Sequence, residues 1–386
     1  MLCYLDNAAT TFPKPDCVYE EVKRCISSYC GNPGRSAHSL SLAASQKIFE
    51  CRELLADTFG ASELERVSFT LNTTYALNTV IKGMLKKGDH VLISDIEHNS
   101  VLRPISKLAK EGIIEYDIFP SMLSHPRRSP TLICAKIAAL VRPNTRMVIC
   151  SHASNICSLT MPIKEIGEFC RKRGILFVVD GAQSAGHLNI DVDNMSISAL
   201  CLPSHKGLYG IQGAGAVLLG KGIYPDTLTE GGSGVNSVDT AMPESSPERY
   251  EAGTLPTPAI ASLCEGIKFI NGVGTAHITE HTRALYRYAR EQLCNINTVS
   301  LYASNFEGAT LLFNVKDMHS EKVANELNKY SICVRGGLHC TPLAHKTLNT
   351  SDNGAVRVSF GIFNRTRDID TLAYALNQIA KQPSVL

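Results

Sequence analysis

Short apolar segments alternate with amphipathic segments along the first two-thirds of the chain. The apolar segments read VSFTL, HVLISDIEH, MVICSHASN, ILFVVDGAQ and SALCLPSHK, and the stretch YALNTVIKGMLKKG that follows the first has helical spacing of its apolar residues. Nearly continuous apolar strands separated by amphipathic helices are typical of a parallel sheet covered on both faces. The pattern therefore predicts an α/β fold built on a mainly parallel sheet.

The composition changes around residues 240–258, where Pro, Glu and Ser are concentrated in AMPESSPERYEAGTLPTP. A long helical stretch, AIASLCEGIKFI, follows this break. Beyond it, LLFNV and AVRVSF predict strands, and EKVANELNKY and DIDTLAYALNQIAKQ (368–382) predict helices. A chain of 386 residues also exceeds one typical hydrophobic core. We predict a large domain over residues 16–255 and a small domain over 256–386, which the N-terminal segment 1–15 joins.

The bulk composition excludes several classes of protein. The formal net charge is +2 and the charges are interspersed, so we expect no nucleic-acid partner. The N-terminus MLCYLDNAATTFPKP lacks the pattern of a signal peptide, and no apolar stretch reaches transmembrane length. Fourteen cysteines are scattered without a CxxC pair, which argues against a zinc or dithiol site. We expect a cytoplasmic protein without membrane association, in which most cysteines are reduced and buried.

Two residues at strand ends predict a cofactor. Asp180 ends the apolar strand ILFVVD, and Lys206 lies in the turn SHKGLYG, just before the glycine-rich GIQGAGAVLLG. A lysine amine can form an imine with pyridoxal phosphate (PLP), while a carboxylate keeps the pyridine nitrogen of that cofactor protonated. For each residue alone, the alternative is a capping aspartate or a solvated surface lysine.

A phosphate site is predicted where VSFTL gives way to a helix. The residues Asn72, Thr73 and Thr74 stand at this junction, where amides and hydroxyls at a helix N-terminus can bind an anion. The alternative is that Thr73 or Thr74 is only the N-cap of the helix. Ser204 and His205, beside the lysine, are further candidates for phosphate contacts.

Other polar residues at strand ends suit the cofactor ring and a substrate. His98 could lie flat on a pyridine ring, and Asn155 and Gln183 could both hydrogen-bond its phenolic oxygen. Arg357 lies in the otherwise apolar strand VRVSF, and a buried guanidinium needs an anion. That anion is either a substrate carboxylate or the carboxylate of a structural salt bridge.

One cysteine differs from the others in its surroundings. Cys340 follows Gly336 and Gly337 in the segment VRGGLHC, where Arg335 and His339 would favour a thiolate. We therefore single out Cys340 as a candidate nucleophile.

These motifs, in this order, resemble the class V, fold-type I PLP enzymes, and within them the cysteine desulfurase and selenocysteine lyase group. The resemblance extends from YLDNAATTFPKP through GNPGRSAHSLS, EHNS, SHASN, DGAQSAGH, SHKGLYG and RYEAGTLPT to RGGLHC and VRVSFGIFN. The segment RGGLHC looks like the loop of the SufS-type enzymes. The resemblance implies a large PLP-binding domain with a mainly parallel seven-stranded sheet flanked by helices, and a smaller C-terminal α/β domain.

The resemblance also implies a role for each matched residue. Around the cofactor ring, Lys206 matches the Schiff-base lysine, Asp180 matches the pyridinium partner, His98 matches the ring-stacking histidine, and Gln183 and Asn155 match the residues near the phenolic oxygen, with Asn155 also near the substrate. The phosphate site is matched by Thr73, Thr74, Ser204 and His205, and Thr254 matches a threonine that is offered across a dimer interface. Arg357 matches the arginine that binds the substrate carboxylate, and Cys340 matches the cysteine that takes sulfur as a persulfide. It implies a homodimer that binds PLP and no metal, acts on L-cysteine, and passes sulfur to an acceptor protein.

The chain departs from the pattern of these enzymes at two places. Leu338 stands in GLHC where the similar enzymes have GHHC, and ICSLTMPI follows Asn155 where they commonly have a glycine. Cys333 is either a relay thiol for Cys340 or a buried strand cysteine. The alternatives to a cysteine desulfurase are a selenocysteine lyase or related β-lyase, a class V aminotransferase, and a catalytically silent scaffold subunit.

Overall fold

A seven-stranded sheet forms the centre of the larger part of the molecule. The structure is a computed structural model and describes residues 2–34, 36–125, 127–235 and 238–381. The strand order is β2-β8-β7-β6-β5-β3-β4, and β8 alone runs antiparallel to both of its neighbours. The strands are β2 (Val67–Thr70), β3 (Asp89–Ser94), β4 (Ile114–Phe119), β5 (Thr145–Ser151), β6 (Leu176–Asp180), β7 (Ala199–Pro203) and β8 (Gly215–Leu219). The predicted α/β fold with a mainly parallel seven-stranded sheet is confirmed.

Helices cover both faces of this sheet, which explains why its strands are apolar without alternation. One core cluster joins α3 (Thr73–Met84) and α4 (Asn99–Lys110) to residues such as Val178. The neighbouring Val179 belongs to the cluster on the opposite face. The helices on that face are α2 (Ser39–Phe59), α5 (Pro130–Ala138), α6 (Ile163–Arg171) and α7 (Thr257–Val273). Since successive side chains of a strand point to opposite faces, both must be apolar.

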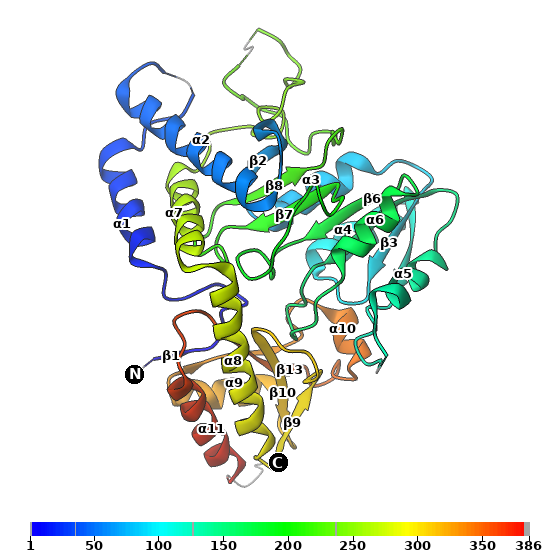
Figure 1. The fold of residues 1–386 in the computed structure, drawn as a ribbon, viewed down its shortest axis with the longest axis vertical. Helices are drawn as coiled ribbons and strands as arrows, with labels where there is room; N and C mark the ends of the chain where they lie inside the picture. The colour runs from blue at the N-terminus through cyan, green and yellow to red at the C-terminus, as the bar shows by residue number, and fades with distance from the viewer. Residues whose placement is uncertain (1, 35, 126, 236–237, 382–386) are drawn as a thin grey trace.

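A second, antiparallel sheet lies below the first in Figure 1 and has a core cluster of its own. Its strands, in spatial order, are β12 (Arg335–Gly337), β13 (Ala355–Ser359), β10 (Thr310–Val315) and β9 (Val299–Tyr302). The helices of this part are α8 (Thr275–Cys294), α9 (Ser320–Lys329), α10 (Pro342–Thr347) and α11 (Thr366–Ala380). The helix predicted at 368–382 is therefore present as α11, and residue 382 lies outside the described residues.

The N-terminal segment joins the C-terminal part of the chain. β1 (Cys3–Tyr4) pairs in parallel with β11 (Ile332–Cys333), and Asp6 forms a bridge with Ser359 at the end of β13. From there the chain crosses to α1 (Asp16–Arg24), which packs against α7. This crossing places residues 5–11 between the two sheets, where the site described below is found (Figure 1).

The predicted domain boundary at 255/256 stays a prediction. Helix α7, which the prediction assigned to the small domain, packs against α1 and α2 and contributes to the core of the large sheet. The next helix, α8, runs alongside the second sheet and contacts β9 and β10. Among the described residues, no helix is long and apolar enough to span a membrane.

Candidate active site

A cavity of about 330 Å³ opens where β5, β6 and β7 end and where α3 and α4 begin. The carboxyl ends of the strands in an open α/β sheet are where such sheets bind ligands. Residues from the second sheet close the cavity from the other side. Nine of the residues singled out in the sequence line it: Thr73, Thr74, His98, Asn155, Asp180, Gln183, His205, Lys206 and Arg357. The structure thus brings together residues that are as much as 284 positions apart (357 − 73).

Asp180, the last residue of β6, is buried in the floor of this cavity at 5% exposure. Its Oδ1 accepts a hydrogen bond from the backbone N–H of Ala182 at 2.9 Å. Burial raises the pKa of Asp180, and the Ala182 N–H and the charge of Lys206 oppose that shift. Among the residues that the structure describes, no lysine or arginine forms an ion pair with this carboxylate. Asp180 therefore has acceptor capacity for a protonated nitrogen of a ligand.

Lys206 follows β7 and reaches into the same cavity. Its pKa is lowered to about 8, first because the amine is removed from water and then because Arg357 and Arg335 repel its positive charge, while Asp180 acts in the opposite sense. A lysine with a pKa near neutrality is in part unprotonated, which is the form that attacks carbonyl groups. The geometry suits Lys206 for imine chemistry.

The N-terminus of α3 faces the cavity with free donors. Asn72, whose side chain accepts a hydrogen bond from Tyr75 N at 2.9 Å, is the N-cap of this helix. The alternative prediction of Thr73 or Thr74 as the N-cap is therefore wrong, because both are helical residues. The buried hydroxyl of Thr73 has no partner among the described residues. Helix amides and an unpartnered hydroxyl suit an anion such as a phosphate.

A close approach of two backbones shapes this anion site. A Cβ atom added at Gly215, the first residue of β8, would lie 2.6 Å from the carbonyl oxygen of Leu202 and 2.9 Å from Asn72 Cα. Only glycine lets β8 pack this closely against the turn before α3. The glycine-rich sequence GIQGAGAVLLG is thus part of the support of the site.

His98 is the N-cap of α4, and its ring orientation is fixed. The Nδ1 atom accepts a hydrogen bond from Ser100 N at 3.0 Å and lies 2.8 Å from Ser100 Oγ, which is in turn 2.8 Å from Thr74 Oγ1. Burial lowers the pKa of His98 to about 4, and Lys206 and Arg335 add to this effect. The ring is therefore neutral near pH 7, with its hydrogen on Nε2. Ser100, which the sequence reasoning missed, connects the histidine to the start of α3.

Arg357, on β13, is 1% exposed and already has partners. Its Nη2 donates to Asp6 Oδ1 at 2.6 Å, and its Nη1 donates to the carbonyl oxygen of Asn155 at 3.0 Å. The buried Nε has no partner among the described residues. The structural salt bridge that the sequence left open is present, and Nε is the one nitrogen of this guanidinium for which the described residues offer no partner.

The side chain of Asn155 is committed to the segment that carries Cys340. Its Nδ2 donates to the carbonyl oxygen of His339 at 2.8 Å, and its Oδ1 accepts a hydrogen bond from Thr341 Oγ1 at 2.5 Å. Asn155 lines the cavity, so its predicted contacts with cofactor and substrate stay predictions. What the structure adds is a contact between the end of β5 and the Cys340 segment.

Cys340 lies in the connection between β12 and α10, at the side of the cavity where Arg335 and His339 contribute to the lining. Arg335 Nη2 is 3.9 Å from Cys340 Sγ. Cys340 is partly exposed and Leu338 is 42% exposed. All fourteen cysteines are free, and Cys333 lies on β11, away from the lining of this cavity.

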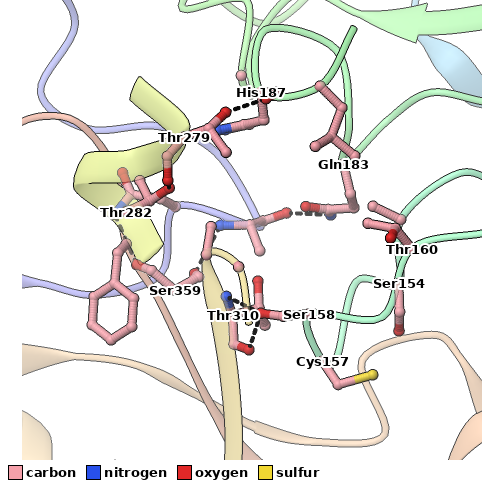
Figure 2. Close-up of a pocket in the computed structure, with 18 of the residues that line it drawn as sticks. Ser154, Cys157, Ser158, Thr160, Gln183, His187, Thr279, Thr282, Thr310 and Ser359 are labelled. Carbon is pink, nitrogen blue, oxygen red and sulfur yellow. Dashed lines mark hydrogen bonds between the residues drawn. The ribbon is translucent and has the colours of Figure 1, made fainter. Parts of the chain in front are cut away.

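Gln183 lies between this cavity and a smaller one of about 110 Å³, shown in Figure 2. Its Nε2 donates to the carbonyl oxygen of Ala8 at 2.9 Å, which leaves its Oε1 available. Lys206 also lines both cavities. Cys157, from the segment that stands where a glycine was expected after Asn155, lines the smaller cavity.

Two predicted phosphate contacts lie outside the lining of the cavity. The hydroxyl of Ser204 is fully buried and finds no partner in the part of the chain that the structure describes, and a Cβ atom added at Gly210 would lie 2.1 Å from it. Thr254 is exposed, in the segment before α7. The buried Nδ1 of His205 also lacks a partner among the described residues, although His205 does line the cavity. The roles of Ser204 and Thr254 in a phosphate site stay predictions.

A buried carboxyl group next to Asp180 was missed from the sequence. Glu97 is fully buried and accepts hydrogen bonds from Ser151 N at 2.8 Å and from Ser94 Oγ, while its Oε2 lies 3.0 Å from Ser151 Oγ. Ser151 is the partner of Asp180 in the β5–β6 register. Burial raises the pKa of Glu97 to about 8, and the charge of Asp180 adds to this shift. An acidic residue in the polar segment DIEHN gives no sequence signal of such burial.

Comparison with known proteins defines the class first. The sequence model of the family described as aminotransferase class-V matches residues 3–372, and the chain belongs to this family.

Individual relatives of this chain have names that are more specific than the family description. A probable cysteine desulfurase of Pyrococcus abyssi is 31% identical, and the match covers 98% of this chain and 94% of that protein. One from Methanothermobacter thermautotrophicus is 32% identical with the same coverage. The apo structure of a cysteine desulfurase from Thermococcus onnurineus NA1 is similar with a TM-score of 0.89 at 28% identity, covering 98% of this chain and 95% of that one.

Proposed function

We propose that this protein is a PLP-dependent cysteine desulfurase, which converts L-cysteine to L-alanine and retains the sulfur as a persulfide on Cys340. The observation that carries the proposal is that Lys206, Asp180 and Arg357 face one cavity, to which the segment holding Cys340 contributes Arg335 and His339. The cysteine desulfurases among its relatives support the same conclusion.

The residues present fit the cofactor. A buried carboxylate without an ion-pair partner, the unpartnered hydroxyl of Thr73 at a helix N-terminus, and a buried amine lie around one cavity. The carboxylate would contact the pyridine nitrogen of PLP, the hydroxyl would contact its phosphate, and the amine would bond to its aldehyde carbon. When bound, PLP supplies an electron sink for carbanions at the substrate Cα. Asp180 would hold the pyridine nitrogen protonated, and the neutral ring of His98 would lie against the face of the cofactor.

Lys206 would act twice. It would bind the cofactor through its amine, and after substrate has displaced it, the free amine would accept the Cα proton of the substrate. A pKa lowered to about 8 leaves the amine able to lose its proton near neutrality and to take one up again. The same amine would return a proton to the product.

Arg357 would orient the substrate through its carboxylate. Its Nε has no partner within the described ranges, while Asp6 and Asn155 O hold the rest of the guanidinium in place. A fixed guanidinium binds a carboxylate with little loss of side-chain entropy. This contact would set the substrate Cα toward Lys206.

Cys340 would receive the sulfur. Its thiolate attacks the sulfur of the substrate, so that an S–S bond forms as the Cβ–S bond breaks. The electron pair stays on the carbon side, where protonation gives alanine, and the enzyme keeps a Cys340 persulfide. The guanidinium of Arg335, with its Nη2 3.9 Å from Sγ, is the positively charged group beside this sulfur. An acceptor protein would then remove the persulfide sulfur.

The proposal includes a homodimer, in which the exposed Thr254 would contribute to the site of the partner. Thr254 does not line the cavity of its own chain, so it would reach a phosphate only in the site of a second copy. Gel filtration of the holoenzyme, with wild type and Thr254→Ala compared for cofactor retention, tests this part of the proposal.

The decisive experiment is an assay of purified, PLP-loaded protein with L-cysteine, L-selenocysteine and cysteine sulfinate. We expect alanine and an equal amount of persulfide from cysteine. Alanine from selenocysteine alone would identify a selenocysteine lyase, and turnover that requires a keto acid would identify an aminotransferase. A protein that neither turns yellow with PLP nor bleaches with borohydride would contradict the cofactor assignment.

A further inference from the structure

Two adjacent residues of the Cys340 segment have a backbone conformation that side chains disfavour. His339 has φ 51° and Cys340 has φ 58°, both in the left-handed region. Non-glycine residues take this conformation when surrounding contacts hold them there. The carbonyl oxygen of His339 accepts a hydrogen bond from Asn155, and that of Cys340 accepts one from Asn99 N at 2.8 Å. The segment is therefore fixed through its main chain at both positions.

The ring of His339 adds a third connection, and its hydrogen positions follow from its partners. Its Nε2 lies 3.0 Å from the carbonyl oxygen of Arg335. A carbonyl oxygen can only accept, so Nε2 carries the hydrogen and the Nδ1 of the neutral ring must accept. The atom facing Nδ1 is His345 Nε2, at 3.2 Å. His345 therefore donates to His339.

The same logic continues to the end of the chain of hydrogen bonds. With its hydrogen on Nε2, His345 accepts at Nδ1, where the hydroxyl of Thr350 lies at 2.8 Å. The two imidazole rings are nearly parallel, with centroids 5.4 Å apart and an interplanar angle of 16°. Three hydrogen bonds thus run in one direction from Thr350 through His345 and His339 to Arg335.

Both rings are neutral at physiological pH. His345 is fully buried and His339 is 3% exposed. Burial lowers the pKa of His345 to about 4 and that of His339 to about 3, and the charges of Arg357 and Arg335 add to the shift of His339. Both ring nitrogens of His339 face other partners, Arg335 O and His345, so the expectation that His339 favours a thiolate stays a prediction. Arg335 remains the cation beside Sγ.

We propose that His345 is a positioning residue for the Cys340 thiol, which it holds through the hydrogen bond to His339. The donor N–H of His345 locks the His339 ring, and the ring is tied to Arg335, whose guanidinium faces Cys340 Sγ. Removing the N–H of His345 leaves the buried Nδ1 of His339 without a donor, in a segment whose backbone conformation is already disfavoured. This inference rests on the proposed function only in naming persulfide formation as the step for which the thiol is positioned.

Two variants separate hydrogen bonding from packing. His345→Gln keeps an N–H donor at the position of Nε2, whereas His345→Leu fills the space without a donor. His281→Leu on α8 is the control, since its Nε2 also lies 3.0 Å from a backbone carbonyl oxygen, that of Asn364. Circular dichroism and thermal melting verify that each variant is folded.

The first readout needs no turnover. The rate of alkylation of Cys340 by iodoacetamide depends on the position of the thiol. Mass spectrometry of the peptide that contains Cys340 measures this rate in apoprotein and holoprotein. We expect His345→Leu to change this rate by about threefold or more, because a segment that loses a fixed contact no longer holds its reactive group in one geometry. His345→Gln and the control should keep the wild-type rate.

The second readout is catalysis in the holoenzyme. We expect His345→Leu to lower the kcat for alanine release by about tenfold or more, with the KM for cysteine and the cofactor absorbance unchanged, because misplacement of a reacting group by a fraction of an ångström has effects of this size. His345→Gln should restore most of the rate.

The outcomes are distinct. Wild-type alkylation and kcat in His345→Leu would overturn the proposal, and so would equal losses in the Leu and Gln variants, since those indicate packing. If wild-type protein makes no persulfide while alkylation still separates Leu from Gln, the positioning role stands and the proposed function fails.

Discussion

Arg357 and Asp6 form an ion pair, with 2.6 Å between Nη2 and Oδ1, although 351 residues separate them in the chain (357 − 6). The arginine is buried on β13, and the aspartate follows β1 at 20% exposure of its side chain. The pair joins the N-terminal segment to the wall of the cavity. It also occupies the Nη2 side of the guanidinium, and the Nε has no partner among the described residues.

We expect Asp6→Asn to lower the free energy of unfolding by about 2 kcal/mol, because it leaves a buried guanidinium without its counter-charge. Urea unfolding measures the change. Saturating L-alanine, whose carboxylate can take the place of Asp6, should restore more stability to the variant than to wild type. Glu111→Gln, in the exposed pair with Lys107, is the control and should change stability by less than about 0.5 kcal/mol. A variant as stable as wild type would contradict the role of the pair.

Replacement of Lys206 by alanine should abolish turnover, because in the proposed function the same amine binds the cofactor and moves the proton. The yellow absorbance that borohydride bleaches should be absent from Lys206→Ala, while the protein still folds. The measurement is the absorbance spectrum before and after borohydride, together with alanine release. Bleaching in this variant would place the imine on another lysine.

Replacement of Cys340 should separate the cofactor from the sulfur chemistry. We expect Cys340→Ala to keep the yellow colour and its response to cysteine, and to lose at least about a hundredfold in alanine release, since this variant lacks the proposed nucleophile. Cys333→Ala, on β11, is the matched variant and should release alanine at the wild-type rate. Undiminished desulfuration by Cys340→Ala would exclude the persulfide role, and an equal loss in both variants would indicate a relay.

Glu97→Gln should change the dependence of stability on pH. The pKa of Glu97 is raised from 4.5 to about 8, so the folded state keeps a proton that the unfolded state has released between these values. The stability that this proton provides is complete below pH 4.5 and is lost as the pH rises to 8, by about 1.4 kcal/mol per pH unit.

The amide introduced by Glu97→Gln mimics the protonated acid and does not titrate. We therefore expect the stability of the variant relative to wild type to increase steadily from pH 5 to pH 8, measured by denaturant unfolding at each pH. A constant difference across this range would indicate that Glu97 is ionised in the folded protein.

Buried histidines should make the protein sensitive to acid. Six of them have pKa values lowered by burial, to about 4 or, for His339, to about 3: His98, His152, His187, His205, His339 and His345. The unfolded chain protonates them near pH 6.5, so their contribution to stability is complete above that pH and is lost as the pH falls toward 4.

Each proton taken up on unfolding changes the unfolding free energy by about 1.4 kcal/mol per pH unit. Glu97 releases a proton on unfolding in this range, which cancels the effect of one histidine. We expect the unfolding free energy to fall between pH 6.5 and pH 4.5, with a net uptake of several protons on unfolding. Thermal melting across this range measures the slope. An unfolding free energy independent of pH would show that these rings are accessible to protons in the folded state.

The sequence was sufficient for the fold class and for the residues at strand ends. Continuous apolar strands require a sheet covered on both faces, and the carboxyl ends of such strands meet at one edge. Asp180 and Lys206 could therefore be selected from their positions in the chain. The antiparallel direction of β8 could not be predicted, because an apolar strand sequence is compatible with either direction.

Contacts made by distant residues were beyond sequence reasoning. Nothing near Asp6 indicates an arginine partner on β13, and the acidic residue in DIEHN looks like part of a polar loop although Glu97 is fully buried. The alternative of an N-cap at Thr73 or Thr74 was wrong because Asn72, Thr73 and Thr74 are all favourable capping residues, and the choice depends on which side chain reaches Tyr75 N.

The pairing of β1 with β11 has a consequence for the order in which the protein matures. During synthesis the N-terminal residues emerge first, yet Cys3 and Tyr4 find their partners only at Ile332 and Cys333, and Asp6 only at Arg357. Lys206 is therefore made long before the wall around it can close. A growing chain that has not yet reached Arg357 lacks the finished wall of the cavity, so any ligand that needs this wall can bind only after that residue has been added.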